Sequence, residues 1–96
     1  MKVIGRPQIG EWIRLHPEAA SALQAWLCEA DAAAWSSVRD VGSRYRAARI
    51  TPDGAVVFPL CAGRFALETR VHFTAQAVLV VKLAVCQSDQ FALQLE

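Results

Sequence analysis

In RFALETRVHF, residues 64–73, apolar and polar side chains alternate. Successive side chains of a β-strand point to opposite faces, so this pattern predicts a strand with one apolar and one polar face. The predicted apolar face holds Phe65, Leu67, Thr69, Val71 and Phe73. The predicted polar face holds Arg64, Ala66, Glu68, Arg70 and His72. We therefore expect one face to pack on a core and the other to meet solvent.

The residues on both sides of this strand predict more sheet. Residues 78–85 are apolar except Lys82, a pattern that indicates a central strand covered on both faces. Turn signals stand at 52–54 (PDG) and 61–63 (CAG), and Val, Phe and Leu replace Ala after Arg46. The second half of the chain is therefore expected to form an antiparallel sheet.

The first half of the chain predicts helices. Residues 17–34 are rich in alanine, and Leu23, Trp26, Leu27 and Ala30 recur at helical spacing. A shorter helix is expected over 8–15, ending before Pro17, and it should pair with the helix over 17–34 as a hairpin. A third helix is expected over 37–45 with Ser36 or Ser37 as its cap. Helices followed by strands predict an α+β fold in one domain that spans residues 1–96.

Composition excludes several classes of protein. The chain has 96 residues and 10 Lys+Arg against 9 Asp+Glu, so 10 − 9 gives a net charge of +1, unlike that of a polyelectrolyte tail. Its three cysteines are far apart and predict neither a disulfide framework nor a zinc site, which favours a cytoplasmic location. The first residues do not read as a signal peptide, and the longest apolar run, 77–81, is far short of the roughly 20 residues of a membrane helix.

The densest charge lies in residues 39–49, where four arginines stand against one acid and give a local charge of +3. Arginine binds phosphate through a planar fork, and an interleaved tyrosine can stack on a base. The segment therefore contributes candidate RNA- or partner-binding residues, namely Arg44, Tyr45, Arg46 and Arg49. The alternative is a solvated helix end whose arginines bind terminal carbonyls.

A second candidate set lies on the polar face of the predicted strand 64–73. Arg64, Arg70 and His72 could follow the phosphates of a bound strand, with His72 as an acid–base group. Glu68 interrupts this set, and ion pairing of the arginines with Glu68 is the alternative. No nucleotide loop, paired-carboxylate site or metal cluster stands out, so no metal and no cofactor is expected.

Several motifs in order resemble one family. The N-terminus reads MKVIGR, His16-Pro17 opens a helix with Trp26 in its middle, Trp35 closes the helical half, and Tyr45-Arg46-Ala47-Ala48 follows. Together with the strand that opens at Arg64, these features resemble the HigB toxins of type II toxin–antitoxin systems, within the RelE-like superfamily. The resemblance covers almost the whole chain.

The resemblance implies two or three helices packed on a curved antiparallel sheet, and a metal-free ribonuclease that cuts mRNA in the ribosomal A site until an antitoxin binds it. By position, Arg46 matches the arginine of a Tyr-Arg motif, Arg64 a strand lysine and Lys82 a basic residue of the last strand. With His72 as a substitute acid–base group, the catalytic candidates are Arg46, Arg64, His72 and Lys82.

Departures from the family pattern point to altered chemistry. Ala55 and Ala66 stand where the family carries basic groups, and Gln87 and Gln90 where it carries a histidine and a tyrosine. Glutamine cannot exchange a proton near neutral pH. Two hypotheses follow: a descendant that keeps the fold and acts by binding a host protein or nucleoprotein complex, as an inhibitor on a phage or plasmid, or an active mRNA interferase held by an antitoxin. Neither involves a membrane or a small-molecule cofactor.

Overall fold

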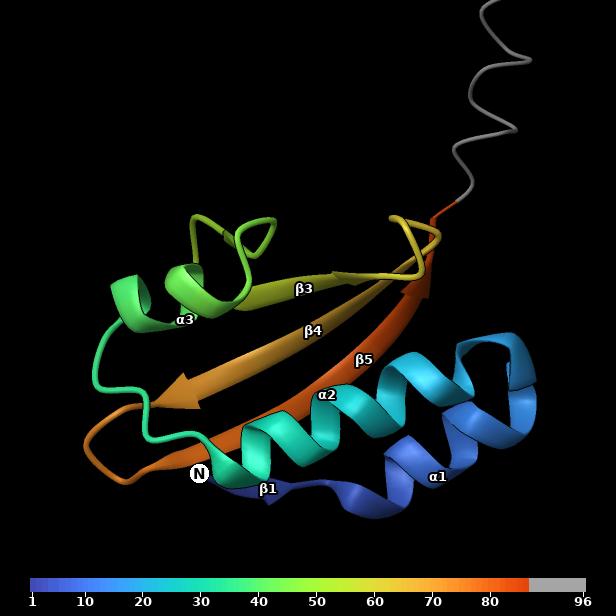
Figure 1. The fold of residues 1–96 in the computed structure, drawn as a ribbon, viewed down its shortest axis with the longest axis horizontal. Helices are drawn as coiled ribbons and strands as arrows, with labels where there is room; N and C mark the ends of the chain where they lie inside the picture. Colours follow the sequence, from blue (N-terminus) through green and yellow to red (C-terminus); the bar gives the residue numbers. More distant parts are fainter. Residues whose placement is uncertain (87–96) are drawn as a thin grey trace, which may run out of the picture.

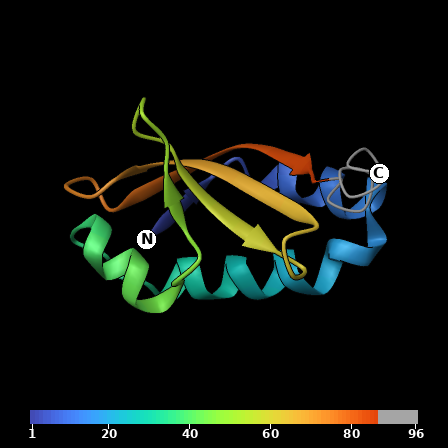
Figure 2. The ribbon, with the colours of Figure 1, turned by 90° about the horizontal axis from the view of Figure 1, so that it is seen from above.

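The computed structural model describes residues 1–86 as a five-stranded sheet with helices along one side (Figures 1 and 2). In chain order the elements are β1 (Lys2–Ile4), α1 (Arg6–Leu15), the 3-10 helix η1 (Pro17–Ala19), α2 (Ala20–Ala32), α3 (Val38–Arg44), β2 (Arg49–Ile50), β3 (Val56–Leu60), β4 (Phe65–His72) and β5 (Ala77–Val85). The α+β prediction is confirmed, because the last helix ends at Arg44 and β4 occupies the alternating stretch.

The sheet has the strand order β1-β5-β4-β3-β2. All neighbours are antiparallel except β1 and β5, which run parallel with Val3 opposite Val78. The sheet is therefore mixed, whereas the sequence predicted an antiparallel one, because β1 was missed. Three residues are too few to show an alternating pattern, and the partner of β1 lies more than 70 residues away in the chain.

The predicted helical hairpin is confirmed, with α1 and α2 side by side (Figure 1). Leu23, Trp26 and Ala30 of α2 are buried at the expected spacing. The boundaries differ from the expected 17–34, since the segment begins as η1 and α2 ends at Ala32. The amino group of Met1 donates a hydrogen bond to the carbonyl oxygen of Ala30 at 2.9 Å, which places a positive charge at the negative end of the α2 dipole.

Phe58 of β3 is at the centre of the core. It is fully buried, and its ring lies 5.5 Å from that of Trp26 and 5.1 Å from that of Tyr45, both in edge-to-face contact. The ring of Trp35 stacks on it at 6.1 Å. These aromatic contacts join α2, the segment after it and the residue after α3 to one strand.

The expectation that 78–85 is covered on both faces is wrong. Val78 and Val80 are buried, but Leu79 and Val81 are 41% and 38% exposed on the other face of β5. A bulge contributes to this, because Glu68 pairs with Lys82 while Thr69 pairs with Val80, leaving Val81 as an extra residue. Among residues 1–86 the helices cover only one face of the sheet, so the apolar strand β5 is covered on one side by this part of the chain (Figure 2).

Gly5 joins β1 to α1 in a conformation that other residues rarely adopt, with φ of 101°. A Cβ at Gly5 would lie 2.6 Å from Cγ2 of Val80, whereas a Cβ at Gly10 of α1 would meet nothing within 4 Å. We expect Gly5→Ala to lower the free energy of unfolding by about 2–4 kcal/mol through strain and overpacking. The matched control Gly10→Ala should raise it by about 0.5–1 kcal/mol, and equal effects in urea denaturation would contradict this account.

Candidate partner-binding face

The face of the sheet turned away from the helices, here called the open face, carries the candidate site. Side chains alternate along β4, so Phe65, Leu67 and Thr69 are buried against the helices while the residues between them point outward. The predicted assignment of these residues to two faces is confirmed. The turn between β2 and β3 rises on the side of the open face (Figure 2).

The strand register sets the order of groups across the open face. Arg49 of β2 is opposite Val57, Val57 is opposite Glu68, and Glu68 is opposite Lys82. Nζ of Lys82 lies 3.8 Å from a carboxylate oxygen of Glu68. The candidate cation Lys82 therefore has an acidic neighbour directly across the strand pair, an arrangement typical of sheet surfaces.

Arg70 is bound to the turn between β2 and β3. Its guanidinium donates to the backbone oxygen of Asp53 at 2.7 Å and to the carboxylate of Asp53 at 2.6 Å. The Thr51 hydroxyl donates to the same carboxylate, and together with Arg70 it holds the pKa of Asp53 below its usual range. The pairing is complete at neutral pH and is lost only as the pH falls through that lowered value.

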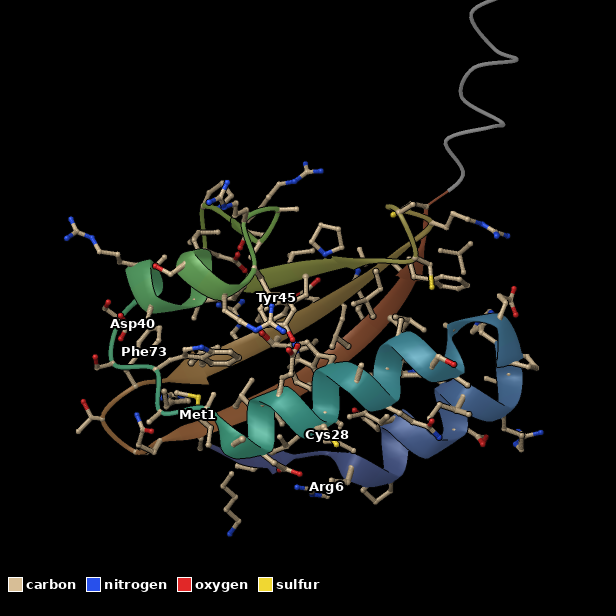
Figure 3. The ribbon with its side chains drawn as sticks, viewed as in Figure 1. Met1, Arg6, Cys28, Asp40, Tyr45 and Phe73 are labelled. Carbon is tan, nitrogen blue, oxygen red and sulfur yellow. The ribbon has the colours of Figure 1, made fainter. Side chains whose placement is uncertain are left out.

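Neutralising Asp53 is expected to free Arg70 for anions. Asp53→Asn should raise the affinity for a short single-stranded RNA and steepen the dependence of log K on log salt by about 0.7, the value for one added phosphate contact. The matched control is Asp31→Asn, which removes the same charge and frees Arg6, whose partner is Asp31, beside α1 and α2 (Figure 3). Fluorescence anisotropy at several salt concentrations measures both, and an equal response would show that Arg70 has no special access to RNA.

A hollow of about 410 Å³ lies between β2, β3 and the start of β4. Its apolar walls include Ile50, Val57, Pro59, Phe65 and Ala66. Among its described lining residues Arg49 alone is charged. This cavity, named the β2–β3 hollow, was not predicted from the sequence, because its walls come from segments that show no shared pattern.

Two residues of the predicted binding cluster, Arg44 and Tyr45, bind a carboxylate of α2. The hydroxyl of Tyr45 donates to the carboxylate of Glu29 in α2, and Arg44 forms an ion pair with the same carboxylate. The Tyr45 ring packs on Trp35 and Phe58, and burial raises the pKa of its hydroxyl against the opposing charge of Arg44. Tyr45 points in between α2 and α3 (Figure 3), so its ring faces are engaged within the protein.

The other candidates are exposed but dispersed. Arg46 stands in the turn after α3, and Arg49 stands in β2. Arg64 precedes β4 and His72 ends it, so at roughly 3.3 Å per residue their backbones lie about 26 Å apart and cannot serve one phosphate. Arg49 thus lines the β2–β3 hollow, Arg64 is adjacent in sequence to two residues that line it, and His72 lies at the other end of β4.

Sequence reasoning missed the acids that hold the arginines, namely Glu29 and Asp53. Asp53 stood in a recognised turn signal, yet its partner Arg70 is 17 residues away. The predicted pairing of arginines with Glu68 is wrong in its partners, since Glu68 lies beside Lys82 and Arg70 binds Asp53. Gln87 and Gln90 lie outside the described residues.

One known protein family matches most of the chain. A family model described as HigB_toxin, the RelE-like toxic component of a toxin–antitoxin system, matches residues 19–85. The chain belongs to the HigB toxin family. The matched region includes α2, α3 and strands β2 to β5, so this HigB-family chain carries the family's sequence over both layers of the fold, and the family implies an antitoxin as partner.

Three further findings concern curated relatives, metal ligands and membrane-spanning helices. No curated protein is similar enough in sequence to count as a match. In residues 1–86 there is no group of three His, Cys, Asp or Glu side chains placed to hold a metal ion. Nor does that part of the chain contain a helix with the length and apolar character needed to cross a membrane.

Proposed function

We propose that this HigB-family chain has weakened or lost ribonuclease chemistry and acts as an inhibitor by binding a host protein or nucleoprotein complex in the cytoplasm. The observation that carries the proposal is the state of the cations on the open face. Arg70 is bound to Asp53, Lys82 lies beside Glu68, and the hollow wall at position 66 is alanine.

The physical argument concerns charge and protons. Cleavage of RNA builds negative charge at the scissile phosphate while the 2′-hydroxyl loses a proton, so the site needs free cations and a titratable group close together. Ala55, at a position where the resembled family carries a basic group, is 1% exposed and offers no charge. An arginine paired with a carboxylate stabilises a second anion less, because the negative charge of the carboxylate offsets the positive charge of the arginine.

The alternative is an active mRNA interferase that an antitoxin neutralises. It is favoured by the exposure of Arg46, Arg49 and Arg64, none of which has an ion-pair partner among residues 1–86. In that case the catalytic residues would be sought among Arg46, Arg64, His72 and Lys82, with RNA crossing the open face past Arg70.

The deciding experiment supplies the purified chain to ribosomes translating a defined mRNA and maps new 5′ ends. Absent A-site cleavage together with retained binding to a cellular protein or nucleoprotein complex supports the proposal. Strong cleavage that an antitoxin suppresses would overturn it in favour of the interferase. A genetic setting on a phage or plasmid without an adjacent antitoxin frame would further support the inhibitor role.

A further inference from the structure

The β2–β3 hollow has the properties of a socket for an apolar side chain. Its walls are mostly aliphatic, and Val57, Pro59 and Ala66 all point to the open face rather than into the core. The volume of about 410 Å³ falls within the range of ligand pockets. Filling such a hollow with an apolar group removes this surface from water.

One arginine lines this socket and a second is adjacent in sequence to residues that line it. Arg49 lines it, and the exposed Arg64 stands in sequence between Gly63 and Phe65, two residues that line it. No carboxylate of residues 1–86 forms an ion pair with either arginine. An occupant with negative charge on both sides of its apolar group therefore complements the site.

The edge of the sheet beside the socket offers backbone hydrogen bonds. In the described part of the chain β2 is the last strand of the sheet. The N–H of Thr51 donates inward to the oxygen of Ala55 at 2.9 Å, so antiparallel alternation turns the N–H and C=O of Ile50 outward. An extended peptide can pair with such an edge.

RNA fits this socket less well than peptide does. Recognition of single-stranded RNA relies on exposed aromatic rings on which bases stack. Phe65, the aromatic residue that lines the hollow, is 2% exposed, and its ring contacts His16 in α1's C-terminal cap.

We infer that the β2–β3 hollow binds an extended acidic segment of a partner protein, one that inserts a large apolar side chain between carboxylates. The apolar side chain fills the socket, the carboxylates pair with Arg49 and Arg64, and the backbone pairs with Ile50. The inference rests on the proposed function, since it names the chemistry of the partner that a binding role requires.

The test is an NMR titration of the full ¹⁵N-labelled chain with a synthetic peptide that carries one leucine among glutamates. We expect it to shift the amide signals of Ile50, Thr51, Gly63 and Ala66. A peptide with serine in place of leucine, and another with lysines in place of the glutamates, should leave these signals unmoved. A short single-stranded RNA serves as the competing ligand class.

Two variants separate the socket from the charges. Ala66→Leu fills the hollow without a change of charge and should weaken the acidic peptide roughly tenfold or more, since the leucine of the peptide can no longer be buried. Arg49→Gln should weaken it severalfold. The matched controls Ala25→Leu on the exposed surface of α2 and Arg39→Gln on α3 should leave the affinity unchanged.

Three results would overturn the inference: no binding of the acidic peptide, binding that Ala66→Leu does not affect, or tighter binding of RNA at the same amides. The ribosome assay remains a separate test. Strong cleavage beside a docked peptide would remove the proposed function and leave the docking site, whereas absent cleavage and no docking would remove the docking site alone.

Discussion

The purified chain is expected to cleave mRNA on translating ribosomes at least about 10²-fold more slowly than an active toxin of the family does. Removal of one preorganised contact to a developing charge costs about 10²–10³ in rate. Here Ala66 offers no cation, and Arg70 is bound by two hydrogen bonds to Asp53. Primer extension on a defined mRNA measures the rate at each codon.

Two variants give this experiment its controls. Arg64→Ala and His72→Ala remove the two candidate groups at opposite ends of β4, and neither should change a cleavage rate that is already at background. Strong cleavage by the unaltered chain, abolished by Arg64→Ala, would show that the reaction site lies at the hollow end of the sheet. Abolition by His72→Ala instead would place it at the other end, and either outcome would restore the ribonuclease.

Phe58→Ala is expected to lower the free energy of unfolding by about 3–5 kcal/mol. The side chain is fully buried, and the rings of Trp26, Trp35 and Tyr45 surround it, so alanine would leave a cavity among three aromatic groups. Because small domains have only about 5–15 kcal/mol of stability in total, this change would remove a large share of it. Urea denaturation followed by tryptophan fluorescence measures the loss.

The matched comparison for this core variant is Phe73→Ala. Phe73 follows β4 and is only half-buried at the edge of the core, so the same truncation should cost less than half as much there. Phe58→Leu, which keeps most of the volume, should cost about 1.5 kcal/mol or less. Equal losses for Phe58→Ala and Phe73→Ala would contradict the placement of the core centre at Phe58.

The ion pairs of the candidate arginines show which part of the site could be predicted from the sequence. The arginine-rich segment 39–49 was visible as a run of charge, and Arg49 does lie at the hollow. Arg44, from the same segment, instead pairs with Glu29 in α2. A local charge count cannot separate the two, because the acid that holds an arginine lies 15 residues away in sequence and is brought near only when α2 packs against α3.

Patterns within short segments of the sequence were enough to predict the α+β class, the helical hairpin and the two faces of β4. Each of these depends on periodicity within a short segment, which local sterics and the burial of apolar side chains dictate. Tertiary structure alone decided the parallel pairing of β1 with β5, the exposure of Leu79 and Val81, the capture of Arg70 by Asp53 and the hollow beside β2. These features arise from contacts between distant segments, and their energies depend on which partner each group meets when the layers come together.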